Sequence, residues 1–173
     1  MYKKEWLQKF SYIMLDKLDE KKLKGYQLAN RMGIPTNSFY NNIYGKSVPS
    51  AYTVRLMAKN LGCTTDELLM FDMDDEYVHV EKRNVVTLPE NIPDRIPEDQ
   101  WKKLFAQNLY NKMCECGYTQ IELGRASGLG TTCIFRYLEG ETIPNGWRLV
   151  NLARALECSV DALIDFGGMV INW

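Results

Sequence analysis

The feature that most constrains this 173-residue chain is an internal repeat without gaps. When the sequence is shifted by 95 positions, Trp6 aligns with Trp101 and Phe10 aligns with Phe105. Glycine and proline favour particular turns and helix ends, so their recurrence in one register carries more weight than scattered apolar matches. The repeat predicts two copies of one domain, supported by further identities: Leu28 with Leu123, Gly33 with Gly128, Gly45 with Gly140, Pro49 with Pro144, Leu61 with Leu156, Cys63 with Cys158 and Phe71 with Phe166.

Each copy is predicted to consist of five helices. Apolar residues recur at helical spacing, and glycines follow the apolar stretches as helix-ending residues. The predicted helices span 4–20, 25–32, 35–44, 51–61 and a fifth from about 65, then 101–116, 120–127, 131–139, 146–156 and 160–165. The predicted core of the first copy comprises Leu28, Ala29, Ile34, Phe39, Val54, Met57, Ala58, Leu61 and Leu68. We therefore predict an all-α fold with domains at 1–71 and 99–173, joined by a linker at 72–98.

The predicted linker, 72–98, opens with an acidic run and contains three prolines. Val78 and Val80 alternate with polar residues, and the β-prone run 85–88 follows, which favours a short β-hairpin. An isolated hairpin is marginally stable in water. Two interpretations follow. Residues 77–88 either pair with a second chain, as a homodimer contact, or simply connect the two domains.

The near-neutral charge of the whole chain hides an uneven distribution. Residues 1–71 hold eleven Lys/Arg and six Asp/Glu, residues 72–100 hold three and nine, and residues 101–173 hold seven of each. Because affinity for nucleic acid depends on the charge of a domain rather than of a chain, only the first copy has the excess of cations that attracts phosphate.

Several function classes find no support. No apolar run has the length of a membrane span and the N-terminus lacks a signal-peptide pattern, which predicts a cytoplasmic protein without a membrane partner. Cys63 and Cys158 follow apolar runs and are interpreted as small buried hydrophobes. The C-x-C pair at 114–116 has no second pair nearby, and His79 is the single histidine, so we expect neither a metal nor another cofactor. Without a glycine-rich phosphate loop or a nucleophile–base set, we expect no enzyme and no small-molecule substrate.

Both copies resemble the Cro/C1 repressor-type helix-turn-helix family, also called the XRE family. The strings that carry the resemblance are GYQLANRMGIPTNSFYNNIYGKSVP and YTQIELGRASGLGTTCIFRYLEGETIP, with the tails LMAKNLGCTTDELL and LARALECSVDALI. A short helix, a glycine, an aliphatic turn residue, a second helix, a glycine and a proline follow one another at the spacing of that family. The resemblance implies two lambda-repressor-like domains that bind double-stranded DNA as a transcription regulator, most readily a repressor.

The resemblance also implies which residues contact DNA. In such domains the third helix enters the major groove, where its exposed side chains meet base edges. Its opposite face is predicted to pack on the domain, through Phe39 and Ile43 in the first copy and Ile134 and Leu138 in the second. The implied base-reading residues are Thr36, Asn37, Tyr40 and Asn41 in the first copy and Thr131, Thr132 and Arg136 in the second. The implied phosphate contacts are Lys24, Lys46, Ser47 and Gln120. Outside this motif, the same side chains would be read as a solvated helix face.

The two copies depart from each other in opposite ways. The first has Gly25 where the second has Gln120, and the second has Glu141 where the first has Lys46. The sequence therefore leaves open whether both copies bind DNA. It also leaves open a second function class, a protein-binding adaptor or inhibitor of the anti-defence or antitoxin type that keeps the fold and uses it against another protein.

Overall fold

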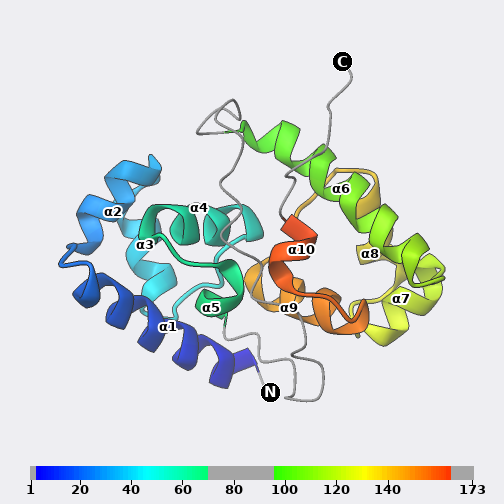
Figure 1. Cartoon of the computed structure of the whole chain (residues 1–173), viewed down its shortest axis with the longest axis horizontal. Helices are drawn as coiled ribbons and strands as arrows, with labels where there is room; N and C mark the ends of the chain where they lie inside the picture. The colour runs from blue at the N-terminus through cyan, green and yellow to red at the C-terminus, as the bar shows by residue number, and fades with distance from the viewer. Residues whose placement is uncertain (1–2, 70–95, 165–173) are drawn as a thin grey trace. The chain divides into compact units, whose positions relative to one another are not determined.

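The computed structural model describes residues 3–69 and 96–164, and within these two ranges the regular secondary structure is helical, with no β-strand (Figure 1). The all-α prediction is thereby confirmed for this part of the chain. The predicted hairpin and the predicted homodimer contact at 77–88 lie outside the described residues.

The helix bounds reproduce the repeat. In chain order the helices are α1 (Lys3–Glu20), α2 (Gly25–Met32), α3 (Thr36–Ile43), α4 (Ala51–Leu61), α5 (Thr65–Leu69), α6 (Glu98–Glu115), α7 (Gln120–Ala126), α8 (Thr131–Leu138), α9 (Gly146–Ala155) and α10 (Val160–Ile164). A shift of 95 positions carries α1, α3 and α5 onto α6, α8 and α10 at both ends. The same shift carries α2 and α4 onto α7 and α9, except that the later helices end one residue sooner.

Each left-handed backbone conformation among the described residues of the first copy recurs at the same shift, even where the residue is not glycine. Gly130, with φ of 79°, has no such counterpart, because Pro35 has φ of −59°. Lys22 has φ of 51° and its counterpart Gly117 has 69°; Gly62 has 66° and its counterpart Glu157 has 49°. A side chain in this region costs energy that glycine avoids, so neither Lys22 nor Glu157 would be chosen for the turn by its own preference. The surrounding fold imposes the turn in both copies.

The core of each copy is anchored by one pair of aromatic rings from its first helix. Trp6 stacks on Phe10 with centroids 5.4 Å apart, and Trp101 stacks on Phe105 at 5.5 Å. All four rings are buried, and burying such large apolar surfaces is the main source of stability in domains of this size. The core predicted for the first copy is also buried, with one exception.

That exception is Ile34, which is half-exposed. It occupies the short turn after Gly33, where its N–H donates to the carbonyl of Ala29 at 3.1 Å. This bond fixes the backbone of the turn and leaves the side chain at the edge of the core. The interpretation of Cys63 and Cys158 as buried hydrophobes was also wrong, because each follows the left-handed residue that ends a helix and remains half-exposed.

Contacts between Cα atoms group the chain into two compact units, each of which is described by itself. Among the described residues, the first contains 3–69 with 144–151, and the second contains 96–143 with 152–164. Within the first unit, the N–H of Ala51 donates to the carbonyl of Pro144 at 2.8 Å. Among the described residues, no helix combines the length and the hydropathy needed to cross a membrane.

Candidate nucleic-acid interface

In the first unit, α2 and α3 are joined by a turn of three residues. Gly33 ends α2 with φ of 63°, and Pro35, the residue before α3, stands in an extended conformation. Helix α3 packs against α1 and α2 and buries Phe39 and Ile43 there. Both were predicted to face the domain. The opposite face of α3 consequently remains in solvent.

The predicted base-reading residues of α3 divide into two pairs. Asn37 and Asn41 are exposed, whereas Thr36 and Tyr40 are half-buried. Sequence reasoning missed Tyr44, the residue after α3, whose side chain is 56% exposed and whose ring stacks on that of Tyr40 at 5.6 Å. Its position four residues after Tyr40 was the available signal, because residues at that spacing lie on one face of a helix.

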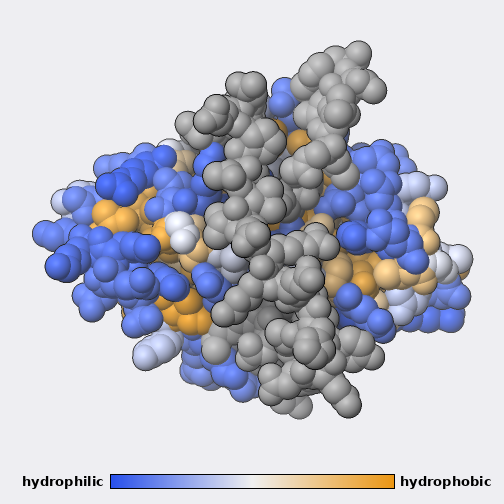
Figure 2. All heavy atoms as spheres, in the orientation of Figure 1, coloured by the Kyte–Doolittle hydropathy of each residue, from blue (hydrophilic) through white to orange (hydrophobic). Residues whose placement is uncertain are grey.

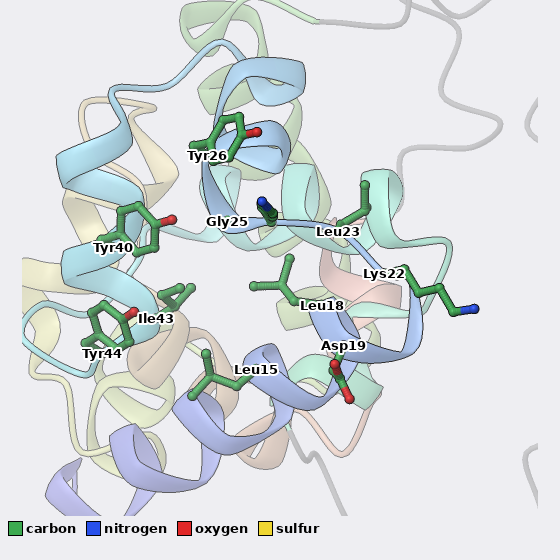
Figure 3. A pocket seen from close by; sticks show the side chains of 11 residues that line it. Leu15, Leu18, Asp19, Lys22, Leu23, Gly25, Tyr26, Tyr40, Ile43 and Tyr44 are labelled. Carbon is green, nitrogen blue, oxygen red and sulfur yellow. The ribbon is translucent and has the colours of Figure 1, made fainter.

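Tyr40 packs against the start of α2, which explains the glycine there. A Cβ atom added to Gly25 would lie 2.9 Å from Cε1 and 3.0 Å from Oη of Tyr40, closer than atoms can approach without a shift. Figure 3 shows the Tyr40 ring on the α3 side of an open hollow with Gly25 on the α2 side; Leu15 and Leu18 of α1 also line it. Tyr40 is therefore a packing residue as well as a candidate reader.

The predicted phosphate contacts of this unit surround α3 and the start of α2. Lys24 and Lys46 are both exposed. The loop after α3 is tied to the helix because the N–H groups of Lys46 and Ser47 both donate to the carbonyl of Asn41, at 2.8 and 3.0 Å. The Ser47 hydroxyl donates to the side-chain oxygen of the buried Asn42 at 2.7 Å. Lys46 and Asn41 are thus kept at one end of α3.

In the second unit, α7 starts with a reciprocal cap. The Thr119 N–H donates to the Glu122 carboxylate at 2.8 Å, and the Glu122 N–H donates to the Thr119 hydroxyl oxygen at 3.3 Å. The bond from the Thr119 backbone is the main reason that the pKa of Glu122 is lowered. The predicted phosphate contact Gln120 is the first residue of this helix and is half-buried.

Helices α7 and α8 approach each other most closely at Gly124. A Cβ atom there would lie 2.9 Å from the backbone nitrogen of Thr131 and 3.0 Å from the carbonyl carbon of Gly130. Backbone atoms cannot move aside as a flexible side chain can. The glycine therefore sets the spacing between the two helices, and with it the position of α8.

The outer face of α8 carries all three predicted readers of the second copy. Thr131, Thr132 and Arg136 are exposed, and so is Phe135, which sequence reasoning missed. The inner face differs from the prediction in one respect. Ile134 is buried as predicted, but Leu138 is only half-buried, and the fully buried position beside it is Tyr137.

Arg136 makes an ion pair with the loop that follows α8. Its Nε lies 3.2 Å from Oε2 of Glu141, and both side chains are about half-exposed. On the face drawn in Figure 2, hydrophilic residues cover most of the described surface and hydrophobic residues form small areas between them. Among the described residues, no group of His, Cys, Asp and Glu could hold a metal ion.

Comparisons with known proteins identify a similarity in the second copy. No curated protein and no solved structure matches the chain. Residues 109–163 match the model of a helix-turn-helix family. The matched range begins inside α6 and ends inside α10, so it includes α7, the turn and α8. This part of the chain is therefore similar to helix-turn-helix domains.

Proposed function

We propose that the chain is a sequence-specific regulator of transcription, acting as a repressor, with two helix-turn-helix copies that insert α3 and α8 into the major groove of double-stranded DNA. One observation carries the extension to the first copy, which the family match does not cover. Helix bounds and left-handed turns recur at a single shift of 95 positions, so 14–68 repeats the helices of the matched residues 109–163. Repression would follow from occupancy of a promoter.

The exposed side chains suit base reading. A major groove about 12 Å wide admits one helix, and asparagine can bond both edge groups of adenine, whereas arginine can bond both acceptors of guanine. Asn37 and Asn41 are exposed amides one turn apart on α3, and Arg136 is the exposed cation on α8. The two copies are therefore expected to read different bases and to favour an asymmetric site.

Affinity for phosphate is expected to come mostly from the first copy. It holds the excess of cations, and Lys24 and Lys46 flank its helix-turn-helix in exposed positions. Gln120 would contact the backbone in the second copy, where positive and negative charges balance. Because each neutralised phosphate releases counterions, this affinity should fall steeply as salt rises.

The test uses the intact chain and a pool of random DNA duplexes. Sequences enriched by binding are recovered, and dissociation constants are measured on the enriched duplex at several salt concentrations. Asn41→Ala and Arg136→Ala should each lower discrimination at one base pair by about 5- to 150-fold. The matched changes at Asn30 and Arg154, exposed residues outside α3 and α8, should leave discrimination unchanged. Lys46→Ala should weaken binding to all duplexes equally and lower the salt slope by about one.

Failure to enrich any sequence, together with binding that does not respond to salt, would refute the proposal. It would favour a second candidate, a protein-binding adaptor or inhibitor, for which the second copy offers one specific observation. Tyr110, Ile121 and Phe135 are 51%, 51% and 46% exposed. Their counterparts in the first copy, Leu15, Tyr26 and Tyr40, all line one hollow, so the repeat predicts that the three lie close together. Pairing through 77–88 remains a separate prediction, which sedimentation of the intact chain can test.

A further inference from the structure

We propose that Glu141 is a positioning residue that presents Arg136 to a guanine base. This inference rests on the proposed function, because it assumes that α8 enters the major groove. It assigns a role to a carboxylate that simple electrostatics would count as unfavourable, since Glu141 stands where the first copy has a lysine and where phosphates would approach.

Glu141 is attached to Arg136 at two points. Its backbone N–H donates to the Arg136 carbonyl at 3.1 Å, and its Oε2 accepts from Arg136 Nε at 3.2 Å. Gly140 makes the return possible, because its φ of 66° turns the chain back onto the end of α8. The backbone thus holds the Glu141 carboxylate beside Arg136.

The atom that Glu141 binds is the important detail. A guanidinium has five N–H donors, one on Nε and four on the two terminal nitrogens. Glu141 accepts the bond from Nε and leaves the terminal nitrogens of Arg136, which have no hydrogen-bond partner among the described residues. Guanine presents two acceptors, N7 and O6, at the spacing that a forked arginine matches. The ion pair thus restrains Arg136 through Nε and leaves its terminal N–H groups available to the base.

Such restraint should increase discrimination between bases. A free arginine loses much rotamer freedom when it is fixed on a base, and it can also turn toward a phosphate. An arginine whose Nε is already bound to a carboxylate loses less rotamer freedom on binding and samples fewer orientations. The expected consequence is a larger difference in affinity between guanine and the other bases at one position.

The first copy has the same backbone arrangement with different side chains. Lys46 donates from its N–H to the carbonyl of Asn41 at 2.8 Å, as Glu141 does to Arg136. An asparagine has a short side chain that needs no support from the loop, and a lysine cannot accept a hydrogen bond. The residue at this loop position therefore matches the proposed base-reading residue beside it. Glu141 accompanies Arg136, and Lys46 accompanies Asn41.

The positioning role of Glu141 and its negative charge predict different effects of its removal. Removing a carboxylate near DNA should raise affinity for every duplex, because repulsion from phosphates decreases. Removing a positioning residue should in addition lower discrimination at the base pair that Arg136 reads. Glu139 provides the matched control, since it is an exposed acid at the end of α8 with no hydrogen bond or ion pair to Arg136.

The experiment compares Glu141→Ala, Glu141→Gln, Glu139→Ala and Arg136→Ala in the intact chain. Dissociation constants are measured on the duplex enriched from the random pool, on its single base-pair variants and on a duplex of unrelated sequence. Both alanine changes at acids should tighten binding to the unrelated duplex. Only Glu141→Ala should also lower discrimination, by at least about 5-fold, at the G·C pair where Arg136→Ala lowers it. Glu141→Gln keeps an acceptor oxygen and should retain part of that discrimination.

The proposal is overturned if Glu141→Ala changes binding only as Glu139→Ala does, or if Arg136→Ala affects no particular base pair. The first result refutes only the positioning role. The second also refutes base reading by Arg136, and neither excludes DNA binding by the chain. Failure of the chain to enrich any sequence refutes the proposed function itself. Far-UV circular dichroism and thermal unfolding of each variant show that a loss of discrimination does not come from a loss of the fold.

Discussion

The contact between Gly25 and Tyr40 can be measured as a coupling energy. A Cβ atom at residue 25 would lie 2.9 and 3.0 Å from Cε1 and Oη of Tyr40, and 3.1 Å from Cε1 of Phe39. Alanine at this position therefore requires the Tyr40 ring to move, and overpacking of this kind costs about 1–3 kcal/mol. Alanine also favours a helix over glycine by up to about 1 kcal/mol. The net cost of Gly25→Ala should be about 1–2 kcal/mol in the wild-type background.

When Tyr40 is first replaced by alanine, two of the three close approaches disappear. The contact with Phe39 remains and retains part of the penalty, but the higher helix propensity of alanine offsets it. Gly25→Ala should then be close to neutral. The difference between the two backgrounds is a coupling energy of about 1–2 kcal/mol. Urea unfolding of the intact chain, followed by circular dichroism, gives all four free energies of the cycle.

Tyr44 supplies the matched background for this cycle. Its ring stacks on Tyr40, but none of its atoms is among the nearest neighbours of the missing Cβ atom. Gly25→Ala should therefore keep its full cost when Tyr44 is replaced by alanine. An equal cost of Gly25→Ala with and without Tyr40 would refute the packing explanation for this glycine.

Four further predictions concern stability. Lys22→Gly should raise the free energy of unfolding by about 1 kcal/mol and the melting temperature by about 2–4 °C, because glycine adopts the left-handed turn without strain. Gly117→Ala should lower that free energy by a similar amount in the same measurement, although its Cβ atom would meet nothing within 4 Å. Asn108→Ala should cost about 2 kcal/mol in urea unfolding, because its buried amide donates to two carbonyl groups of α10. Glu122→Gln should be less stable than wild type at neutral pH. The difference in free energy of unfolding between the two proteins should decrease as the pH falls below about 4.5 and through the lowered pKa of Glu122, because the stability that its ionised form contributes is lost there. A difference that does not change with pH would contradict a stabilising role of the ionised Glu122.

Helix positions in this chain were largely predictable because glycine and proline mark their ends. Helices α2, α3 and α4 begin and end within about one residue of the predicted bounds, and α5 begins at the predicted residue. Helix ends are intrinsically uncertain by about one residue. The start of α6 was predicted three residues late. Glu98 and Asp99 precede the predicted start and form the first turn of that helix, where acidic residues are favoured.

The side-chain contacts of the candidate site were less predictable. Periodicity shows which face of a helix is buried, but it does not show which rotamer a residue at the edge of that face adopts. Tyr40 was assigned to the reading face from its position, and its packing on Gly25 depends on how closely α2 approaches α3. The pair of Arg136 with Glu141 was missed for a similar reason, because the two residues meet only after the chain reverses at Gly140.

The two proposed reading helices differ in how affinity and discrimination are divided among residues. Helix α3 contains no charged residue, so its neutral amides would read bases while lysines outside the helix attract phosphate. Helix α8 carries one cation, Arg136, and the adjacent Glu141 cancels its charge. A paired arginine contributes little to general attraction and can still form two directed bonds to a base. The neutral charge of the second copy is therefore compatible with base reading, provided that the first copy supplies the attraction that brings the chain to DNA.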